Sequence, residues 1–374
     1  MRTKLRVGLA GTGDIGRLHA RAFLKRNDVE LCVCQGVKAG GAEAFAREFG
    51  AQVYPNYEGM LADASVMAVD ICVPNDLHRR FVEEAAAAGK HILCEKPIAL
   101  TLADAEAMIA AAEQANVLLM IAHPLRFWEE YVKLHAVLGS IEMGDCQAIT
   151  MRRMLSLLMS VGGEAAWRRR PERVGGAIID LQIHDLDFLY WTFGAPETVY
   201  SVAVPATRME FNHCYTTLQY SSGLIAMVES SYLLKGDPMI FTVKAICEGG
   251  TLDYQLNPDS FDMHAIEGIH NTSGVGNLAS LTCYRSDGRR EVLGYQQPEV
   301  FDTTFAAEIS YFVDCILQKT PNTRVPVNDA LATLRIALAA KESAIHRRVI
   351  PLDDSQFPST KDHSLLRDYE DHPG

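Results

Sequence analysis

A short apolar run near the start of the chain, residues 5–10, ends in three closely spaced glycines. A helical pattern of apolar residues begins directly after them, so the glycines occupy a turn between a strand and a helix. Backbone amides at such a turn face an anion at the helix N-terminus, which is how the pyrophosphate of a dinucleotide is bound. We therefore expect a dinucleotide to bind at this turn, through Gly11, Thr12, Gly13, Asp14 and Ile15.

Each glycine of the turn has a separate expected role. Gly11 permits the tight turn, Gly13 lets the phosphates approach the backbone, and Gly16 lets the helix pack closely against the strand. The same spacing alone is often only a loop. The strand before it and the helix after it are what favour a nucleotide site.

Length and composition narrow the remaining possibilities. The 374 residues are too many for one ordinary domain, and 48% of them are hydrophobic, so two domains with a large core are expected. The net charge of −12 favours a small-molecule partner over nucleic acid or an anionic membrane. The chain has no signal-peptide pattern and no apolar run of transmembrane length, which predicts a cytoplasmic protein. The nine cysteines include no C-x-x-C pair, so we expect free thiols and no metal site.

Up to about residue 122 the chain alternates short apolar runs with longer amphipathic ones, which is the rhythm of a βαβ fold. The expected strands are residues 5–10, 30–34, 52–54, 68–73, 91–94 and 117–122. The expected helices are residues 15–25, 42–49, 77–88 and 102–114. We predict that residues 1–124 form a dinucleotide-binding Rossmann domain with a doubly wound parallel sheet.

After residue 123 one helix, 129–138, precedes a series of strand-like runs separated by turn residues. The expected strands are residues 146–157, 198–204, 213–220, 224–232, 239–246, 250–254 and 281–284, and two helices follow at 305–317 and 328–347. Turn signals between neighbouring strands predict an antiparallel sheet. We therefore expect a substrate-binding and oligomerisation α/β domain over residues 125–357, and a poorly ordered polar tail over residues 358–374.

The residues that follow each strand of a doubly wound sheet lie at the edge where the ligand binds. After the second strand a carboxylate normally binds the adenosine ribose, but this chain has Gln35 and, nearby, Lys38. An uncharged Gln35 and a cationic Lys38 would tolerate a 2′-phosphate, which favours NADP over NAD. The alternative is that Lys38 is an ordinary surface lysine in a loop.

Polar side chains also follow the fourth and fifth strands. Pro74 and Asn75 could contact the cofactor, although capping of the next helix by Asn75 would explain them equally well. Glu95 and Lys96 follow the fifth strand, where charged residues are costly unless they are used. An isolated pair of this kind would more simply be a solvated loop.

A further charged cluster lies in the second half of the chain. Gly175 and Gly176 precede a helical segment in which Asp180, His184 and Asp187 fall on one face, because residues i, i+4 and i+7 stack along a helix. A single histidine on a helix is usually a core residue with a satisfied hydrogen bond. The carboxylate one turn earlier makes a functional site the preferred interpretation.

These motifs occur in a specific order. The glycine turn is followed by Glu95-Lys96-Pro97, then by Arg126-Phe127 after His123-Pro124-Leu125, and then by Gly175-Gly176 with Asp180 and His184. Over residues 4–352 this set resembles the glucose-fructose oxidoreductase / inositol dehydrogenase / rhizopine-catabolism (Gfo/Idh/MocA) family. The missing acid after the second strand is the clearest departure from the family pattern, and it bears on the choice of cofactor.

The resemblance implies a Rossmann domain followed by an α/β domain with a large open antiparallel sheet that often makes oligomer contacts, hence a homodimer or homotetramer. It assigns Lys96 as the catalytic lysine, Asp180 as the substrate-binding aspartate and His184 as the catalytic histidine. Beyond the turn, the residues expected at the cofactor are Gln35, Lys38, Pro74, Asn75, His78, Glu95, Lys96 and Arg126. The residues expected at the substrate are Lys96, Arg126, Phe127, Trp167, Asp180 and His184, with Arg168 and Arg173 as further candidates. Arg126, Phe127, Trp167, Arg168 and Arg173 could equally lie at a domain interface or on the surface.

The chemistry of these groups suits oxidation of a secondary alcohol, in which a hydride leaves to nicotinamide and the hydroxyl loses its proton. Imidazole titrates near neutral pH and is a natural base, and an ammonium stabilises the developing alkoxide. We therefore expect an NAD(P)-dependent dehydrogenase or reductase acting on a sugar, inositol or similar polyol. The alternatives are a redox-assisted glycosidase that recycles its cofactor, and a non-catalytic nucleotide-binding regulator.

Overall fold

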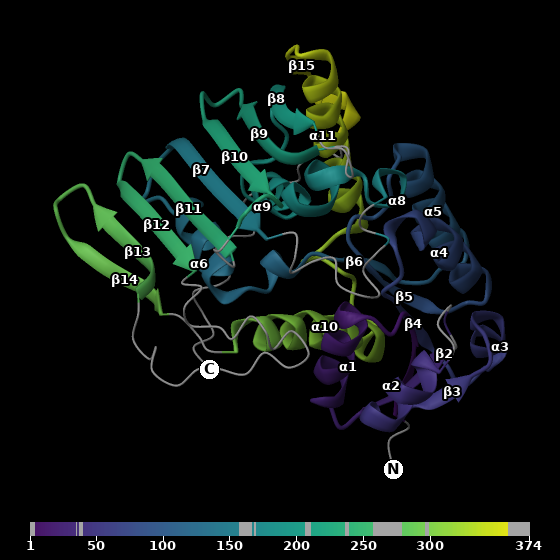
Figure 1. Cartoon of the computed structure of the whole chain (residues 1–374). Helices are drawn as coiled ribbons and strands as arrows, with labels where there is room; N and C mark the ends of the chain where they lie inside the picture. Colours follow the sequence, from purple (N-terminus) through teal and green to yellow (C-terminus); the bar gives the residue numbers. More distant parts are fainter. Residues whose placement is uncertain are drawn as a thin grey trace.

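The computed structural model describes residues 4–34, 36, 40–156, 167, 170–205, 211–235, 239–256, 279–295 and 299–357. Two β-sheets organise these residues, with six strands in one and nine in the other (Figure 1). We call them the parallel sheet and the large sheet. No helix in the described ranges is long and apolar enough to span a bilayer.

The parallel sheet has the doubly wound order expected for the first part of the chain. Its strands are β1 (Leu5–Ala10), β2 (Val29–Cys34), β3 (Gln52–Tyr54), β4 (Ala68–Ile71), β5 (His91–Glu95) and β6 (Leu119–Ala122). They lie in the order β3-β2-β1-β4-β5-β6, and every pair is parallel. The order reverses between β1 and β4, and ligands bind at such a reversal beyond the carboxyl ends of the strands.

The helices of this part are α1 (Asp14–Leu24), α2 (Gly41–Phe49), α3 (Tyr57–Ala62), α4 (His78–Ala87) and α5 (Leu102–Gln114). The sequence pattern predicted all except α3, which has only six residues and is too short to show a helical period. A 3₁₀ turn, η1 (Asn75–Leu77), precedes α4, so the α-helix begins one residue later than predicted.

The large sheet confirms the prediction of a mostly antiparallel second sheet. Its strands are β7 (Cys146–Leu155), β8 (Thr198–Pro205), β9 (Phe211–Gln219), β10 (Ile225–Ser231), β11 (Met239–Cys247), β12 (Gly250–Leu256), β13 (Ala279–Arg285), β14 (Arg290–Tyr295) and β15 (Ile350–Pro351). Their order is β14-β13-β12-β11-β7-β10-β9-β8-β15. Only β7 and β10 pair in parallel. The predictions missed β14 and β15, whose residues do not form clear apolar runs.

Helices cover one face of the large sheet. They include α6 (Glu129–Leu138), α9 (Ile183–Phe193) and α11 (Val327–His346), and α11 packs on both α9 and β8 (Figure 1). On β10, Ala226 and Val228 are buried while Ile225 and Met227 are exposed, as expected when only one face of a sheet is covered. Large apolar side chains are exposed on several of the strands, namely Tyr200, Val202, Val204, Tyr215, Ile225, Met227, Ile246, Tyr284 and Tyr295.

The helix α10 (Val300–Gln318) packs against α1, although the two are nearly three hundred residues apart (Figure 1). Phe305, Ile309 and Phe312 are buried in the same apolar cluster as Leu5 and Phe23 of the parallel sheet and α1. This helix therefore helps to cover the parallel sheet. The division of the chain at residue 124 remains a prediction, and in that division α10 belongs to the second segment.

Candidate active site

The glycine turn between β1 and α1 has the geometry that its sequence suggests. Gly11 has φ +118°, and a Cβ atom there would collide with the backbone of Cys72. A Cβ on Gly16 would collide with the carbonyl oxygen of Gly11, so only glycine allows α1 to pack this closely. By contrast, a Cβ on Gly13 would meet no atom of the described residues within 4 Å beyond its own chain neighbours. Gly13 therefore borders open space at the turn.

This open space lies where the sequence predicts the phosphates of a dinucleotide. Gly13 is the N-cap residue of α1, and as a glycine it has no side chain that could accept a hydrogen bond from the first amides of that helix. Such amides carry partial positive charge and bind anions. Thr12, Asp14 and Ile15 lie at the same turn. Gln35 and Lys38, predicted to contact the ribose, lie outside the described residues.

The residues predicted to contact the cofactor after β4 are engaged with the backbone. Asn75 donates from Nδ2 to the carbonyl oxygen of Val174 at 3.2 Å. The ring nitrogens of buried His78 lie 2.8 Å and 3.0 Å from the carbonyl oxygens of Pro97 and Val73. Burial lowers the pKa of His78. These contacts hold the loops after β4 and β5 together, next to Lys96.

Lys96 and Asp180 form the contact that joins the two sheets at the site. The Lys96 Nζ donates to the backbone carbonyl oxygen of Asp180 at 2.6 Å and to its carboxylate Oδ1 at 3.2 Å. The other carboxylate oxygen, Oδ2, accepts from the hydroxyl of Tyr232 at 2.6 Å. The side chains of Lys96 and Asp180 are 12% and 3% exposed, so the ion pair is shielded from water yet accessible at the lysine.

Tyr232 is a site residue that the sequence analysis missed. It lies directly after β10 and is buried, and the sequence pattern predicted it only as part of a strand. Its position just beyond the end of a strand was the one available signal. That signal was weak because aromatic residues are common in strands.

Asp180 lies in a π-helical turn, η4 (Ile178–Gln182), and the α-helix begins only at Ile183. The prediction of one continuous α-helical face for Asp180, His184 and Asp187 is therefore wrong in its geometry. A π turn holds more residues than an α turn, so it rotates the residues that follow it relative to Asp180. The Asp187 carboxylate binds Arg126 rather than pointing to Lys96.

His184 is partly exposed, and among the described residues none forms a hydrogen bond with its ring. Burial lowers its pKa well below the ordinary value of 6.5, and the positive charges of Lys96 and Arg153 lower it further. Arg153 is itself buried and binds the carboxylate of Asp185 with distances of 2.9–3.2 Å. His184 is therefore neutral at pH 7 and can accept a proton.

Arg126, expected to contact cofactor and substrate, lies fully buried instead of facing open space. Its guanidinium donates to the Asp187 carboxylate at 2.8 and 3.0 Å, to the Asp329 carboxylate at 2.7 Å and to the Arg324 carbonyl oxygen at 3.0 Å. These partners belong to α9, α11 and the segment before α11. In this arrangement Arg126 joins elements of the second part of the chain.

The other pocket candidates occupy varied environments. Phe127 is buried, with the guanidinium of Arg324 over its ring at 4.4 Å. Trp167 is partly buried against the main core. Arg173 donates to Asp76 at 2.9 Å, which ties the segment before η4 to the loop after β4. Arg168 lies outside the described residues.

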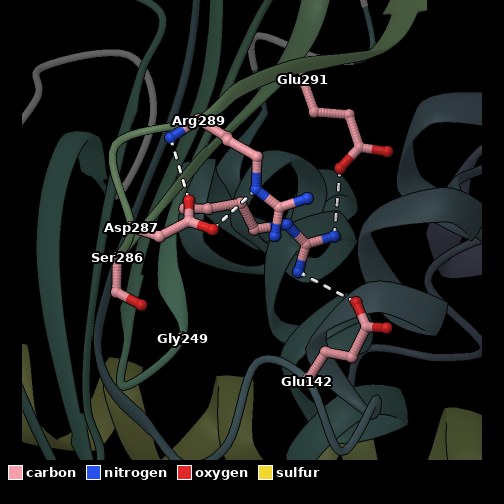
Figure 2. Close-up of a pocket in the computed structure, with 7 residues that line it drawn as sticks. Glu142, Gly249, Ser286, Asp287, Arg289 and Glu291 are labelled. Atoms are coloured by element: carbon pink, nitrogen blue, oxygen red, sulfur yellow. Dashed lines mark hydrogen bonds and ion pairs between the residues drawn. The ribbon is translucent and has the colours of Figure 1, made fainter.

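A separate pocket near the hairpin between β13 and β14 contains none of the predicted site residues. It is lined by Glu142, Gly249, Arg285, Ser286, Asp287, Arg289 and Glu291. Figure 2 shows that its charged groups pair with one another. Arg285 lies between Glu142 and Glu291 at 3.3 and 3.1 Å, and Arg289 donates to Asp287 at 2.6 Å. Lys96, Asp180 and His184 remain the predicted site residues.

Comparisons with known proteins show the family of this chain. Residues 5–123 match the family model described as "Oxidoreductase family, NAD-binding Rossmann fold", and residues 131–253 match the "GFO/IDH/MocA C-terminal domain". An inositol 2-dehydrogenase from Rhizobium meliloti is 26% identical over 93% of this chain and 99% of its own length. A D-glucoside 3-dehydrogenase from Escherichia coli is 28% identical over 62% of this chain and 71% of its own length.

A solved structure shares the fold. It is levoglucosan dehydrogenase in complex with NADH and levoglucosan, with a TM-score of 0.78 and 20% identity over 93% of this chain and 98% of that one.

Proposed function

The chain belongs to the Gfo/Idh/MocA family of NAD-binding oxidoreductases, and we propose that it interconverts a secondary alcohol and a ketone on a sugar, inositol or similar polyol. The observation that carries this proposal is the contact between Lys96, which follows a strand of the parallel sheet, and Asp180, which lies one turn before His184. This contact brings an ammonium and a carboxylate together at the carboxyl end of β5, and the charge of Lys96 acts on the His184 imidazole.

The turn from Gly11 to Ile15 would hold the pyrophosphate of the cofactor, through the uncapped amides of α1. When bound, the nicotinamide supplies the hydride acceptor or donor. We propose NAD or NADP as the cofactor, with NADP binding at least as well as NAD. The sequence Gln35-Gly36-Val37-Lys38 supports that preference, because it offers a cation and no carboxylate near the expected ribose.

His184 is the proposed general base in the oxidative direction. Its neutral imidazole takes the proton of the reacting hydroxyl and returns it when the reaction runs toward the alcohol. Lys96 has three N–H donors, of which two are directed to Asp180. The third is available to a substrate oxygen, where the ammonium stabilises the developing alkoxide.

Asp180 has two roles in this scheme. It fixes the direction of the Lys96 ammonium, and its carboxylate can accept a hydrogen bond from a neighbouring substrate hydroxyl. Tyr232 donates to the second carboxylate oxygen and so holds Asp180 in place. This arrangement supports the proposed substrate class, because a paired ammonium and carboxylate can bind adjacent hydroxyls together.

We also propose that the protein is a homodimer or homotetramer assembled through the uncovered face of the large sheet. The support is the set of exposed apolar side chains on that face, among them Tyr200, Val202, Tyr215 and Met227. A contiguous apolar surface of this kind is usually buried by another subunit. Light scattering at micromolar protein concentration would give a multiple of the 41.2 kDa chain mass, and a monomer mass would refute this assembly.

A substrate screen tests the proposed activity. Sugars, inositols and glycosides are each incubated with NAD or NADP, and the absorbance of reduced nicotinamide is followed. The proposal predicts stoichiometric cofactor reduction with at least one sugar or polyol. Cleavage of a glycoside without net cofactor reduction would instead favour a redox-assisted glycosidase. Binding of cofactor with no turnover of any member of the panel would favour a regulator.

A further inference from the structure

His19 is a buried histidine on the helix that begins at the dinucleotide-binding turn. Its Nδ1 lies 2.9 Å from the carboxylate Oδ2 of Asp70 on β4, and its Nε2 lies 3.1 Å from the carboxylate Oε1 of Glu95 at the end of β5. The ring is completely inaccessible to solvent, and Phe305 of α10 lies against it with a ring-centroid distance of 5.4 Å. His19 thus links α1 to two neighbouring strands.

The groups around His19 favour the charged form of its ring. The Nδ1 contact with Asp70 is a hydrogen bond, whereas the Nε2 contact with Glu95 is an ion pair without a hydrogen bond. A carboxylate beside each ring nitrogen favours a ring that carries a proton on both. Burial alone would lower the pKa of His19, but Asp70, with help from the neighbouring Cys72, raises it well above 6.5. The pKa of Glu95 is lowered by His19 and Lys96 despite its burial. His19 is therefore an imidazolium between two carboxylates.

One further acid is close to this group. Glu308 on α10 is completely buried, and neither of its carboxyl oxygens has a hydrogen-bond partner among the described residues. Burial and then the negative charge of Glu95 raise the pKa of Glu308 to about 8. Glu308 is therefore protonated at neutral pH, and the carboxylates in contact with His19 are those of Asp70 and Glu95.

Glu95 connects His19 to the catalytic lysine. Its second carboxylate oxygen, Oε2, accepts a hydrogen bond from the backbone amide of Lys96 at 3.1 Å. The Glu95 carboxylate is thus held between the His19 ring and the Lys96 backbone. Charged groups of alternating sign follow one another in space, in the order Asp70, His19, Glu95, Lys96 and Asp180. Asp180 lies beside the large sheet.

We propose that His19 is a positioning residue for Lys96, because its imidazolium binds Glu95 and thereby holds the Lys96 ammonium on Asp180. The effect on catalysis rests on the proposed function, whereas the contacts of His19 with Asp70 and Glu95 belong to the folded chain itself.

His19, Asp70 and Cys72 also offer ligand atoms within 4.8 Å of one another, as a metal site would. The 2.9 Å contact between His19 and Asp70 is explained by a charge-assisted hydrogen bond and requires no ion.

Two substitutions separate the two contacts of the ring. In His19→Asn the side-chain amide nitrogen falls near the Nδ1 position, so the variant keeps the contact with Asp70 and loses the contact with Glu95. In His19→Gln the amide nitrogen falls near the Nε2 position, so the variant keeps the contact with Glu95. We expect His19→Asn to lower kcat by about 10-fold or more, since small displacements of a catalytic group have effects of this size. We expect His19→Gln to retain kcat within about 3-fold, and both variants to bind cofactor with a Kd within about 3-fold of the wild type.

His91 provides the matched control. It begins β5, the strand that Glu95 ends, and its Nδ1 accepts a hydrogen bond from the Leu118 amide at 3.0 Å. Four residues of extended strand place it about 13 Å from Glu95. Neither His91→Asn nor His91→Gln should change kcat. Equal losses of kcat in His19→Asn and His19→Gln, or parallel losses of kcat, cofactor affinity and thermal stability in both, would overturn the positioning role.

Two measurements do not depend on turnover, and they keep the proposal testable if the wild type oxidises no polyol. In a ¹³C-histidine NMR titration, with His19 assigned from its absence in His19→Gln, the ring should stay protonated from pH 6 to pH 8. Its pKa should fall in Glu95→Gln. After ¹³C-methylation of lysines, the Lys96 signal should shift in His19→Asn and not in His19→Gln. A neutral His19 at pH 7, or a Lys96 signal indifferent to both variants, refutes the inference whatever the substrate screen shows.

Discussion

The ammonium of Lys96 lies 2.6 Å from the backbone carbonyl oxygen of Asp180, which is 84 residues further along the chain. The contact connects the loop after β5 of the parallel sheet to the π turn that precedes α9. A carbonyl oxygen and a carboxylate oxygen of the same residue both accept from the lysine, so its position is defined in two directions. His184 follows Asp180 by four residues, and the charge of Lys96 lowers its pKa, so its environment is coupled to the same contact.

Replacing the proposed catalytic groups should lower turnover without removing the cofactor. We expect Lys96→Met and His184→Ala each to lower kcat by about 10²-fold or more, the usual size of an electrostatic or general-base contribution. Asp180→Asn should also lower kcat, because Asp180 holds Lys96, and it should raise KM if it binds a substrate hydroxyl as well. Steady-state kinetics and cofactor titration by fluorescence measure these effects. Near-normal turnover in His184→Ala would assign the base to another residue.

The pH dependence of alcohol oxidation should report the proton acceptor. The ordinary pKa of histidine predicts a rise in activity near neutrality, but burial and then the charges of Lys96 and Arg153 lower the pKa of His184 well below 6.5. Protonated imidazole cannot accept a proton, so kcat/KM should be constant at neutral pH and fall only as the pH drops through that lowered pKa. This acid limb should be absent from His184→Ala. A limb above pH 7 that persists in the variant contradicts this assignment.

Gly13 and Gly16 should respond oppositely to substitution by alanine. A Cβ on Gly13 meets no protein atom within 4 Å, so Gly13→Ala should fold with nearly unchanged Tm and lose cofactor affinity. A Cβ on Gly16 would collide with the Gly11 carbonyl, so Gly16→Ala should lower the Tm. Thermal unfolding and cofactor titration of the two variants check this pair. Unchanged cofactor affinity in a folded Gly13→Ala protein would place the pyrophosphate elsewhere.

The preference for NADP depends on Lys38, a residue outside the described part of the chain. If its ammonium binds the 2′-phosphate, Lys38→Ala should weaken NADP binding by about 10-fold and leave the Kd for NAD unchanged, which is a typical effect of losing one charge-assisted contact. Titration of both cofactors with the wild type and the variant measures this. A clear preference for NAD that Lys38→Ala leaves unaltered would show that Lys38 is an ordinary loop residue.

Glu308 should make stability decrease with rising pH. Its pKa is raised to about 8 in the folded protein by burial and by Glu95, while an unfolded glutamate ionises near its ordinary value of 4.5. Between these pH values only the unfolded chain releases the proton, so folding becomes less favourable by roughly 1.4 kcal/mol per pH unit. Glu308→Gln removes this penalty. Its Tm should exceed that of the wild type at pH 8, and the difference should vanish near pH 5.

The exposed Glu113 on α5 serves as the control for that comparison. Glu113→Gln should change the Tm equally little at pH 5 and pH 8. A Tm difference between Glu308→Gln and the wild type that is the same at both pH values would show that Glu308 is ionised in the folded protein.

The local pattern of the chain was sufficient to predict the parallel sheet and most of its helices. The glycine turn, the apolar runs and the amphipathic segments are short-range signals, because they reflect the period of one helix or strand and the conformation of one turn. For the same reason the predicted ends of the elements are within a few residues of the observed ones. The sequence also singled out Lys96, Asp180 and His184 as separate candidates, through their positions after a strand and on a helix.

Only the tertiary structure brought Lys96 to Asp180, added Tyr232, and showed that η4 is a π turn rather than part of a regular helix. It also directed the Arg126 guanidinium to the carboxylates of Asp187 and Asp329, and it packed α10 against α1. None of these follows from local periodicity, because each depends on contacts between distant segments and on which polar groups lose water when those segments meet. The sequence by itself determined which elements form and which chemical groups are available. Long-range packing decided which of those groups meet, how deeply they are buried and which charge they carry.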